Sequence, residues 1–322
     1  MAQKSRNICL LVALVLAAFL VGCQSQQLAA PQSLKIGVLP IEDNFPFFVA
    51  ESQQMFSQAG VDVELVPFNS ARDRDIALMS GQIDGEVADI IAAALLKKSG
   101  TDVRIVSLTM GVTPQEGRFA LLSAPNSGIT TAEQLAGVPV AVSQHTIIEY
   151  VADQLMLQAG VPKESIQKTV VAAIPDRLQL LLNGSVKAAV LPDPFATLAR
   201  VQGAQVVLDD TQSQQNLSQV VLLFRTDVIN QKSQAIKKLI GVYAKSAQEV
   251  NTHPEKYREL FVERARVPAP LKDTYLTPSF SPPQLPKTAD VSRVMDWMVA
   301  KELLSAPFTY QELVDESLLA GS

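Results

Sequence analysis

Cysteine and histidine are scarce in this chain, and positive charge is not in excess. Two cysteines among 322 residues cannot build a disulfide framework or a cysteine metal site. Lys and Arg number 27 against 32 Asp and Glu, and no basic cluster occurs, so the sequence lacks the electrostatic footprint of a nucleic-acid-binding protein. With 48% hydrophobic and 18% charged residues, the composition is that of a globular protein, and the length predicts two domains.

Long apolar runs are confined to the N-terminus. Lys4 and Arg6 precede an apolar run over 8–21, the pattern of a secretory signal. The run is shorter than the roughly 20 residues that a membrane-spanning helix needs, and no later run is long and apolar enough. We therefore expect residues 1–22 to be a signal peptide and the rest to be a body outside the plasma membrane.

The end of this segment predicts a lipid anchor. Leu20-Val21-Gly22-Cys23 resembles the lipobox of bacterial lipoproteins, in which the cysteine is acylated. Two or more acyl chains would anchor the protein stably. Residues 23–33 then form a lipidated tether, polar and proline-containing. The alternative is an ordinary signal peptide followed by a chance cysteine.

The body contains an internal duplication. FPFFVAESQQMFSQAGV from Phe45 aligns with HTIIEYVADQLMLQAGV from His145, and DRDIALMSGQIDGEV from Asp73 aligns with DRLQLLLNGSVKAAV from Asp176. In the second pair each helix ends at a glycine, which can adopt the left-handed conformation without a Cβ clash. Two matches in the same order indicate two copies of one α/β plan.

Apolar periodicity and turn residues predict strands and helices in alternation, which implies βαβ units and mainly parallel sheets. The predicted strands are 34–40, 61–68, 83–88, 103–109, 118–123 and 219–224. The predicted helices are 45–59, 72–80, 89–98, 232–251, 254–264, 289–304 and 309–319, with an irregular surface segment over 267–286. We expect a first lobe of residues 34–115 and 222–322, and a second lobe of residues 116–221.

These features together resemble a known family. The lipobox, the two copies, and the second-lobe sequences SGIT (127–130), EQLAGVPVAV (133–142) and GSVKAAVLPDPF (184–195) are similar to type II periplasmic substrate-binding proteins of ABC importers. The closest branch serves nitrate, sulfonates, taurine and thiamine-pyrimidine precursors, and the resemblance covers about 34–261.

The resemblance implies a two-lobed α/β fold with a ligand cleft between the lobes. It implies a monomeric binding protein, not an enzyme, that captures a small organic solute and delivers it to an ABC permease and its ATPase. No cofactor, metal or nucleic acid is expected. The location is periplasmic, or lipid-anchored on the outer face of the plasma membrane.

In open α/β sheets, ligands bind beyond the carboxyl ends of strands, at helix N-termini. The resemblance places the family's ligand contacts in the same loops. The candidate ligand residues are Ile41, Asn44, Phe45, Asn69, Ser70 and Asp89 in the first lobe, and Ser143, Gln144, His145, Thr146, Asp193 and Phe195 in the second.

Several of these candidates also have a structural interpretation. Phe45 either stacks on a planar ligand or packs in the core, and Asn44 either bonds the ligand or caps a helix. Asp89 is an N-cap, a partner for a ligand amine, or both. Asp193 likewise caps a helix, meets the ligand, or both.

Two further candidates precede the second copy's first helix. Ser143 either contacts the ligand or caps that helix. His145 makes a loop hydrogen bond or a ligand contact, and no companion nucleophile or metal cluster can be assigned to it.

Charge leaves the solute open. Glu42, Asp43, Asp89 and Asp193 favour an amine, whereas helix N-termini and Arg72 or Arg177 favour an anion. The balance favours a neutral or amine-containing planar molecule, such as a precursor of a thiamine-like heterocycle. Nitrate, a sulfonate or an amino acid remains an alternative.

Two rival functions remain open. One is an enzyme on the same fold with His145 as its acid–base residue, against which the export signal argues. The other is a lipid-anchored solute sensor that signals to a receptor.

Overall fold

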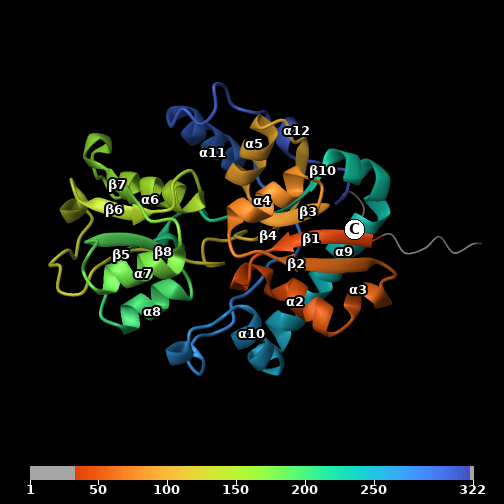
Figure 1. Cartoon of the computed structure of the whole chain (residues 1–322), viewed down its shortest axis with the longest axis horizontal. Coiled ribbons are helices and arrows are strands. Elements are labelled where there is room, and N and C mark those ends of the chain that lie inside the picture. Colours follow the sequence, from red (N-terminus) through yellow and green to blue (C-terminus); the bar gives the residue numbers. More distant parts are fainter. Residues whose placement is uncertain (1–32, 320–322) are drawn as a thin grey trace, which may run out of the picture. The chain divides into compact units, whose positions relative to one another are not determined.

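A computed structural model describes residues 33–319 of the chain. The expected signal peptide and Cys23 lie outside the described residues. Ten strands form two five-stranded sheets, each with its own covering of helices (Figure 1). The first sheet has the order β2-β1-β3-β10-β4 and consists of β1 (Ser33–Val38), β2 (Asp62–Pro67), β3 (Gly85–Asp89), β4 (Val103–Met110) and β10 (Val220–Arg225).

The second sheet repeats the plan of the first. Its order is β7-β6-β8-β5-β9, with β5 (Phe119–Ser123), β6 (Pro139–Val142), β7 (Gln167–Val170), β8 (Ala188–Pro192) and β9 (Gln205–Asp209). In each sheet one strand, β10 or β5, pairs antiparallel with both neighbours. The remaining pairs are parallel. The sheets are therefore mixed, with one reversed strand in each of two otherwise parallel arrangements.

The reversed strands, β5 and β10, are the strands with which the chain enters the second sheet and returns to the first. The chain leaves the first sheet after its edge strand β4 and enters the second as β5. It leaves the second sheet after its edge strand β9 and returns as β10. The expected boundary at residue 222 falls inside β10, which already begins at Val220, because the hydrogen-bonded ladder to β3 starts there.

The helices of the described chain fall into two groups. Those of the first lobe are α2 (Phe45–Ser52), α3 (Met55–Gln58), α4 (Ala71–Met79), α5 (Ile90–Lys98), α9 (Thr226–Thr252), α10 (Arg258–Arg264), α11 (Thr288–Ala300) and α12 (Tyr310–Leu313). Those of the second lobe are α6 (Ile147–Gln158), α7 (Ile174–Leu182) and α8 (Phe195–Val201). Short 3-10 turns occupy Glu42–Asn44, Glu133–Leu135, Lys163–Ser165, Asp210–Gln212, Pro254–Tyr257 and Ala269–Leu271.

Several predicted helices differ from the structure. The one predicted over 232–251 begins earlier, at Thr226 of α9, and the one predicted over 289–304 ends earlier, at Ala300 of α11. The helix predicted over 45–59 is broken into α2 and α3, because Gln54 lies in the left-handed region with a φ of 54°. The last one, predicted over 309–319, is a single capped turn, since Val314 is extended and bridges to Ile105 of β4. The segment over 254–264 begins as a 3-10 turn before α10.

The duplicated helix ends behave as predicted. Gly81 and Gly184, which follow α4 and α7, have φ values of +77° and +76°. Both therefore occupy the left-handed conformation that costs glycine little.

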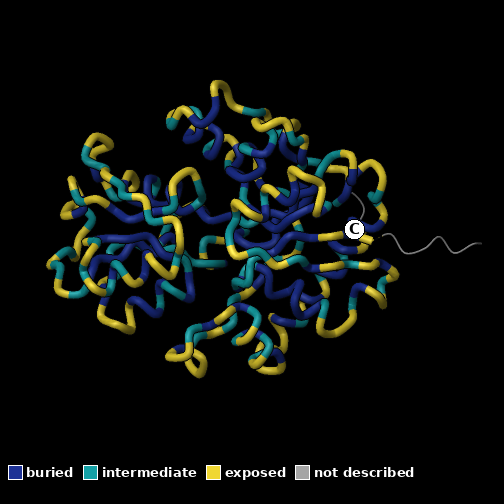
Figure 2. The backbone as a smooth tube through the Cα atoms, in the orientation of Figure 1, coloured by how far each residue is buried: buried dark blue, intermediate teal, exposed yellow. Residues whose placement is uncertain are grey.

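The core of the first lobe lies on both faces of its sheet. In β10, Leu222 and Phe224 belong to the apolar cluster that includes α2 and α9, whereas Val221 and Leu223 belong to the cluster of α5 and α11. This alternation is the period of a strand buried on both sides. Figure 2 shows inner strands such as β3, β8 and β10 largely buried, whereas the edge strands β2 and β7 are partly exposed. No helix of residues 33–319 has the length and apolarity to cross a membrane.

Candidate functional site

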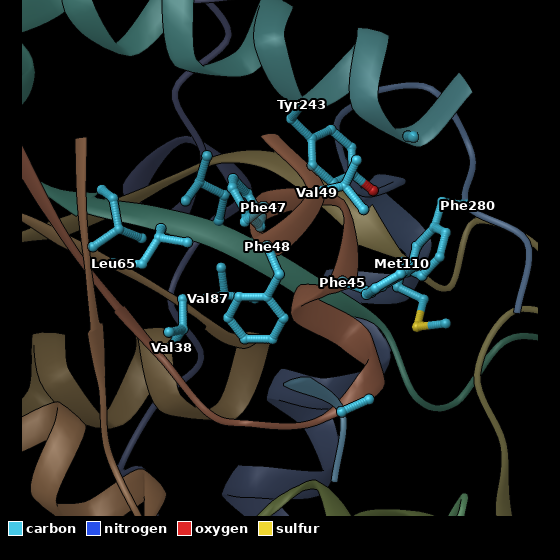
Figure 3. Close-up of a cluster of buried hydrophobic side chains, with 14 of the residues drawn as sticks. Val38, Phe45, Phe47, Phe48, Val49, Leu65, Val87, Met110, Tyr243 and Phe280 are labelled. Atoms are coloured by element: carbon cyan, nitrogen blue, oxygen red, sulfur yellow. The ribbon is translucent and has the colours of Figure 1, made fainter. Parts of the chain in front are cut away.

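The loops that follow the parallel strands hold the predicted site residues. The first-lobe loop after β1 contains Ile41 and Asn44 and leads into Phe45 at the start of α2. Phe45 is completely buried, and its ring meets that of Phe261 edge-on with centroids 4.9 Å apart. Phe45 is thus a core residue in this structure (Figure 3), so stacking on a ligand is not supported. The first turns of α2 are apolar and buried, and the ring of Phe45 belongs to the apolar cluster of the first lobe.

Asn44 is buried with one polar atom unsatisfied. Its Nδ2 donates to the carbonyl of Leu39 at 3.0 Å, while its Oδ1 has no hydrogen-bond partner in the described chain. The side chain does not cap α2. Ile41, in the same loop, is half-buried.

Two first-lobe candidates are helix caps. Ser70 Oγ accepts from the amide of Asp73 at 3.1 Å, and Asp89 Oδ1 accepts from the amide of Ala92 at 2.8 Å. Asn69, beside Ser70, is exposed. Burial raises the pKa of Asp89, and the Ala92 amide and Arg74 only partly offset that effect.

In the second lobe, the loop after β6 is held by hydrogen bonds within the loop and to α6. Thr146, not Ser143, caps α6: its Oγ1 accepts from the amide of Ile148 at 3.2 Å and donates to the carbonyl of Ser143 at 2.7 Å. His145 is exposed and has a positive φ of 60°, and its amide donates to Glu149 Oε2 at 2.7 Å. Gln144 is exposed and Ser143 is half-buried.

The loop after β8 carries Asp193, which has two kinds of partner. Its Oδ1 accepts from the amide and the hydroxyl of Thr197, both at 2.8 Å, and its Oδ2 lies 3.6 Å from Arg118 Nη1. Burial raises the pKa of Asp193 even though Arg118 lowers it. Phe195, at the start of α8, is half-buried.

The loop after β1 also holds a buried carboxyl group, that of Glu42, which is 3% exposed. Burial raises the pKa of Glu42 well above its ordinary value, and the charge of Asp193 raises it further. Tyr275 donates its hydroxyl to Glu42 Oε2 at 2.5 Å. Sequence reasoning missed Tyr275, because it lies 233 residues from Glu42 in a segment predicted to be irregular surface.

That proline-rich segment, residues 267–286, is irregular as predicted, but some of its residues are buried and not at the surface. Tyr275 is stacked on Phe261 with centroids 6.1 Å apart, and Phe280 is 2% exposed. Asn251 of α9 holds the backbone of Phe280 by two hydrogen bonds. The segment therefore packs on the first lobe and brings the hydroxyl of Tyr275 to Glu42.

The duplicated arginines, Arg74 and Arg177, are both buried. Arg74 lies 3.3 Å from Glu86 and 2.8 Å from Asp75, and it donates to the carbonyl of Val87. Arg177 donates to the carbonyl of Val190 at 2.8 Å in the equivalent way. Both side chains therefore connect a helix to the central strand of their own lobe, and the ion pairs of Arg74 with Asp75 and Glu86 lie within the first lobe.

A small pocket lies where the lobes meet the returning chain. It is lined by side chains of α5, α6, α11 and the segment before β10, namely Ile90, Ile91, Ile147, Tyr150, Asn216, Leu217, Gln219, Asp290, Arg293 and Val294. About 10 Å³ of it can be reached by the centre of a water molecule, which is room for about one water. No group of His, Cys, Asp and Glu within residues 33–319 has the arrangement of a metal site.

Comparison with known sequences decides the family. The sequence model of the NMT1/THI5-like family matches residues 42–257, more than half of the chain. The chain belongs to the NMT1/THI5-like family. None of the curated proteins matches the sequence significantly.

Solved structures share the fold of this NMT1/THI5-like chain. The periplasmic aliphatic sulphonate binding protein SsuA from Escherichia coli has a TM-score of 0.75 and 20% identity, over 89% of this chain and 92% of that one. The alkanesulfonate-binding protein SsuA from Xanthomonas axonopodis pv. citri, bound to MOPS, has a TM-score of 0.76 and 15% identity, over 90% and 100%. The desulfurization enzyme DSZB has a TM-score of 0.65 and 15% identity, over 90% and 98%. The predicted two-lobed periplasmic-binding-protein fold is thereby confirmed.

Proposed function

We propose that this protein is a solute-binding protein that captures a small organic molecule between its lobes and presents it to an ABC-type permease. The observation that carries the proposal is the position of Asp89 and Asp193, one in each lobe, at the carboxyl ends of β3 and β8. Loops at these strand ends are where open α/β sheets bind ligands. Family membership and the titles of the binding proteins with this fold support the same role.

The chemistry of these loops favours a solute that donates hydrogen bonds from nitrogen. Glu42, Asp43 and Asp89 of the first lobe and Asp193 of the second are acceptors, and burial raises the pKa of Asp43 to about 6. Asn44 adds a buried acceptor atom that has no donor in the described chain. A protonated amine or an N–H-bearing heterocycle would satisfy these atoms, whereas a sulfonate or nitrate would be repelled.

We propose that the hinge is formed by the two segments that cross between the lobes, residues 111–118 between β4 and β5 and residues 210–219 between β9 and β10. Asn216 Nδ2 donates to the carbonyl of Thr113 at 2.8 Å, which ties one crossover to the other. Glu116 accepts from the amides of Gly111 and Val112 at 3.1 and 3.2 Å. Closure about these segments would be stabilised to the extent that the solute binds the closed form better. We place the lobe boundaries at these crossovers.

We also propose that Cys23 carries the lipid anchor, which would hold a monomeric body outside the plasma membrane. The lipobox supports this proposal. A second candidate function is catalysis, since one protein with this fold is titled an enzyme. We propose a non-enzymatic role, because His145 is exposed and its backbone amide, rather than its ring, donates to Glu149.

The test combines a solute panel with two charge variants. The mature protein is screened by thermal unfolding and small-angle scattering against amines, N-heterocycles, sulfonates and nitrate. We expect amine or N-heterocycle binding to raise the melting temperature and reduce the radius of gyration. Asp89→Asn keeps the helix cap but removes the charge, so it should weaken such binding about tenfold without unfolding the protein.

The matched control is Glu64→Gln, on the exposed end of a surface ion pair with Lys35. It should bind as the wild type does. Binding of a sulfonate in preference to every amine would overturn the proposed solute class, and turnover of a captured solute would overturn the non-enzymatic role.

A further inference from the structure

Polar contacts between α11 of the first lobe and α6 of the second join the two lobes, and the sequence alone did not predict them. Trp297 of α11 donates its Nε1 to Asp153 Oδ2 of α6 at 2.9 Å, and Lys301, which ends α11, lies 2.8 Å from Glu149 Oε1. Lys301 also lies 3.6 Å from Asp153. We call these four side chains the interlobe clasp: Glu149 and Asp153 of the second lobe, Trp297 and Lys301 of the first.

The clasp is sheltered from solvent. Glu149 is 2% exposed, and Asp153 and Trp297 are each 6% exposed. The ring of Tyr150 meets that of Trp297 edge-on, with centroids 5.4 Å apart. A hydrogen bond to a buried carboxylate is stronger than one at the surface, so separating the lobes here leaves polar atoms unsatisfied.

Glu149 connects the clasp to the loop of residues 143–146. Its Oε1 faces Lys301, while its Oε2 accepts from the amide of His145 at 2.7 Å. His145 has a φ of 60°, a region that non-glycine residues occupy when their surroundings hold them there. One carboxylate therefore binds the other lobe and shapes the ligand loop.

A second lysine, Lys168, also pairs with Glu149 and separates the effect of its charge from the effect of its contact with the first lobe. Lys168 of β7 lies 3.0 Å from Glu149 and 2.5 Å from Asp153, but it belongs to the same lobe as both acids. Burial raises the pKa of Glu149, and Lys301, the His145 amide and Lys168 more than offset this, which brings it to about 2. Separation of the lobes would therefore leave the pair of Glu149 with Lys168 intact and break its pair with Lys301.

We propose that Glu149 is a positioning residue for the ligand loop 143–146, and that Lys301 and Trp297 complete its environment only when the lobes are together. In this proposal the clasp couples the conformation of loop 143–146 to the arrangement of the lobes, so that the loop is held in its present shape only when the lobes are together. The functional meaning of that loop rests on the proposed function, whereas the clasp itself can be measured without any solute.

A simpler role for Glu149 is capping of α6, since a Glu three residues after the N-cap commonly bonds back to the backbone. Capping alone would not depend on a residue of the other lobe. The deciding variants are therefore Lys301→Met and Trp297→Phe, with Lys168→Met as the matched control. Each lysine variant removes one cation from the same two acids, and only Lys301 comes from the first lobe.

The readouts are amide hydrogen exchange at His145 and Thr146 and the radius of gyration of the solute-free mature protein. Lys301→Met and Trp297→Phe should accelerate exchange at both amides about tenfold and enlarge the radius. Lys168→Met should leave the radius unchanged and accelerate exchange less. The unfolding midpoint of every variant, measured in parallel, confirms that it is folded.

Wild-type exchange in Lys301→Met and Trp297→Phe would overturn the proposal, and so would equal acceleration in Lys168→Met. These outcomes are independent of the solute screen. If no solute binds but the clasp variants behave as expected, the proposed function fails and the clasp stands. If a solute binds and the clasp variants exchange as the wild type does, only the clasp fails.

Discussion

Glu86 offers the clearest test of the electrostatics of the first lobe. It lies in the central strand β3 with its side chain completely buried, and neither carboxylate oxygen has a hydrogen-bond donor in the described chain. Arg74 Nε is 3.3 Å from Oε2. Burial raises the pKa of Glu86 to about 8, because the desolvation cost exceeds the lowering by Arg74. The second lobe has Ala189 at the corresponding position of β8.

The pKa shift predicts how stability depends on pH. The folded-state pKa of about 8 lies above the ordinary glutamate pKa of 4.5, so between these values the native state holds a proton that the unfolded chain releases. The stabilisation is fully present below the unfolded pKa and is lost as the pH rises through the folded pKa. One proton changes the free energy of unfolding by up to about 1.4 kcal/mol per pH unit, or about 4 kcal/mol between pH 5 and pH 8.

Glu86→Gln removes this titration and keeps the volume. Arg74 keeps its contacts with Asp75 at 2.8 Å and with the carbonyl of Val87 at 2.7 Å, so the variant leaves no unpaired arginine. Urea unfolding at pH 5, 6, 7 and 8 should show a stability gain over the wild type that widens with pH. The surface variant Glu64→Gln should show no widening gain.

A constant or shrinking difference between Glu86→Gln and the wild type would refute the reasoning. It would mean that Arg74 keeps Glu86 ionised throughout this range, and that attraction within the pair exceeds the cost of burial.

Three further predictions concern the core, the crossover and the anchor. Phe45→Ala should lower the free energy of unfolding by about 3–5 kcal/mol in urea titrations, because its ring is fully buried against Phe261, and a cost below 1 kcal/mol would contradict a core role. Gly111→Ala should cost more than about 1 kcal/mol in the same assay, since its φ is +86° and a Cβ would lie 2.9 Å from Gln219 Cα; wild-type stability would refute this. Cys23→Ser should move the protein from the membrane fraction to the soluble fraction of cells that process lipoproteins, and persistent membrane association would argue against acylation at this residue.

Local patterns in the sequence were enough to predict many helix ends and caps. The helix ends at Gly81 and Gly184 were readable because a single residue type satisfies the left-handed backbone there. Asp89 was readable as an N-cap for a similar local reason. The break at Gln54 was not, because glutamine gives no signal for a positive φ.

The candidate site was only partly readable. The loops after the strands could be placed from the alternation of strands and helices, which brought Asp193 and Thr146 to the correct edge of the second sheet. The burial of Phe45 could not be inferred, since an aromatic residue at a helix start serves a core and a cleft equally well. Tyr275 was missed because its partner Glu42 is remote in sequence.

By itself, the order of residues determined the repeated βαβ plan, the helix stops and the acidic character of the loops, since each depends on neighbours within one or two turns. Only the tertiary structure decided the reversed strands β5 and β10, the burial of Arg177 and the meeting of Trp297 with Asp153, which are 144 residues apart. Those features arise where segments from different parts of the chain pack together. Their energy depends on desolvation and geometry that no short stretch of sequence contains.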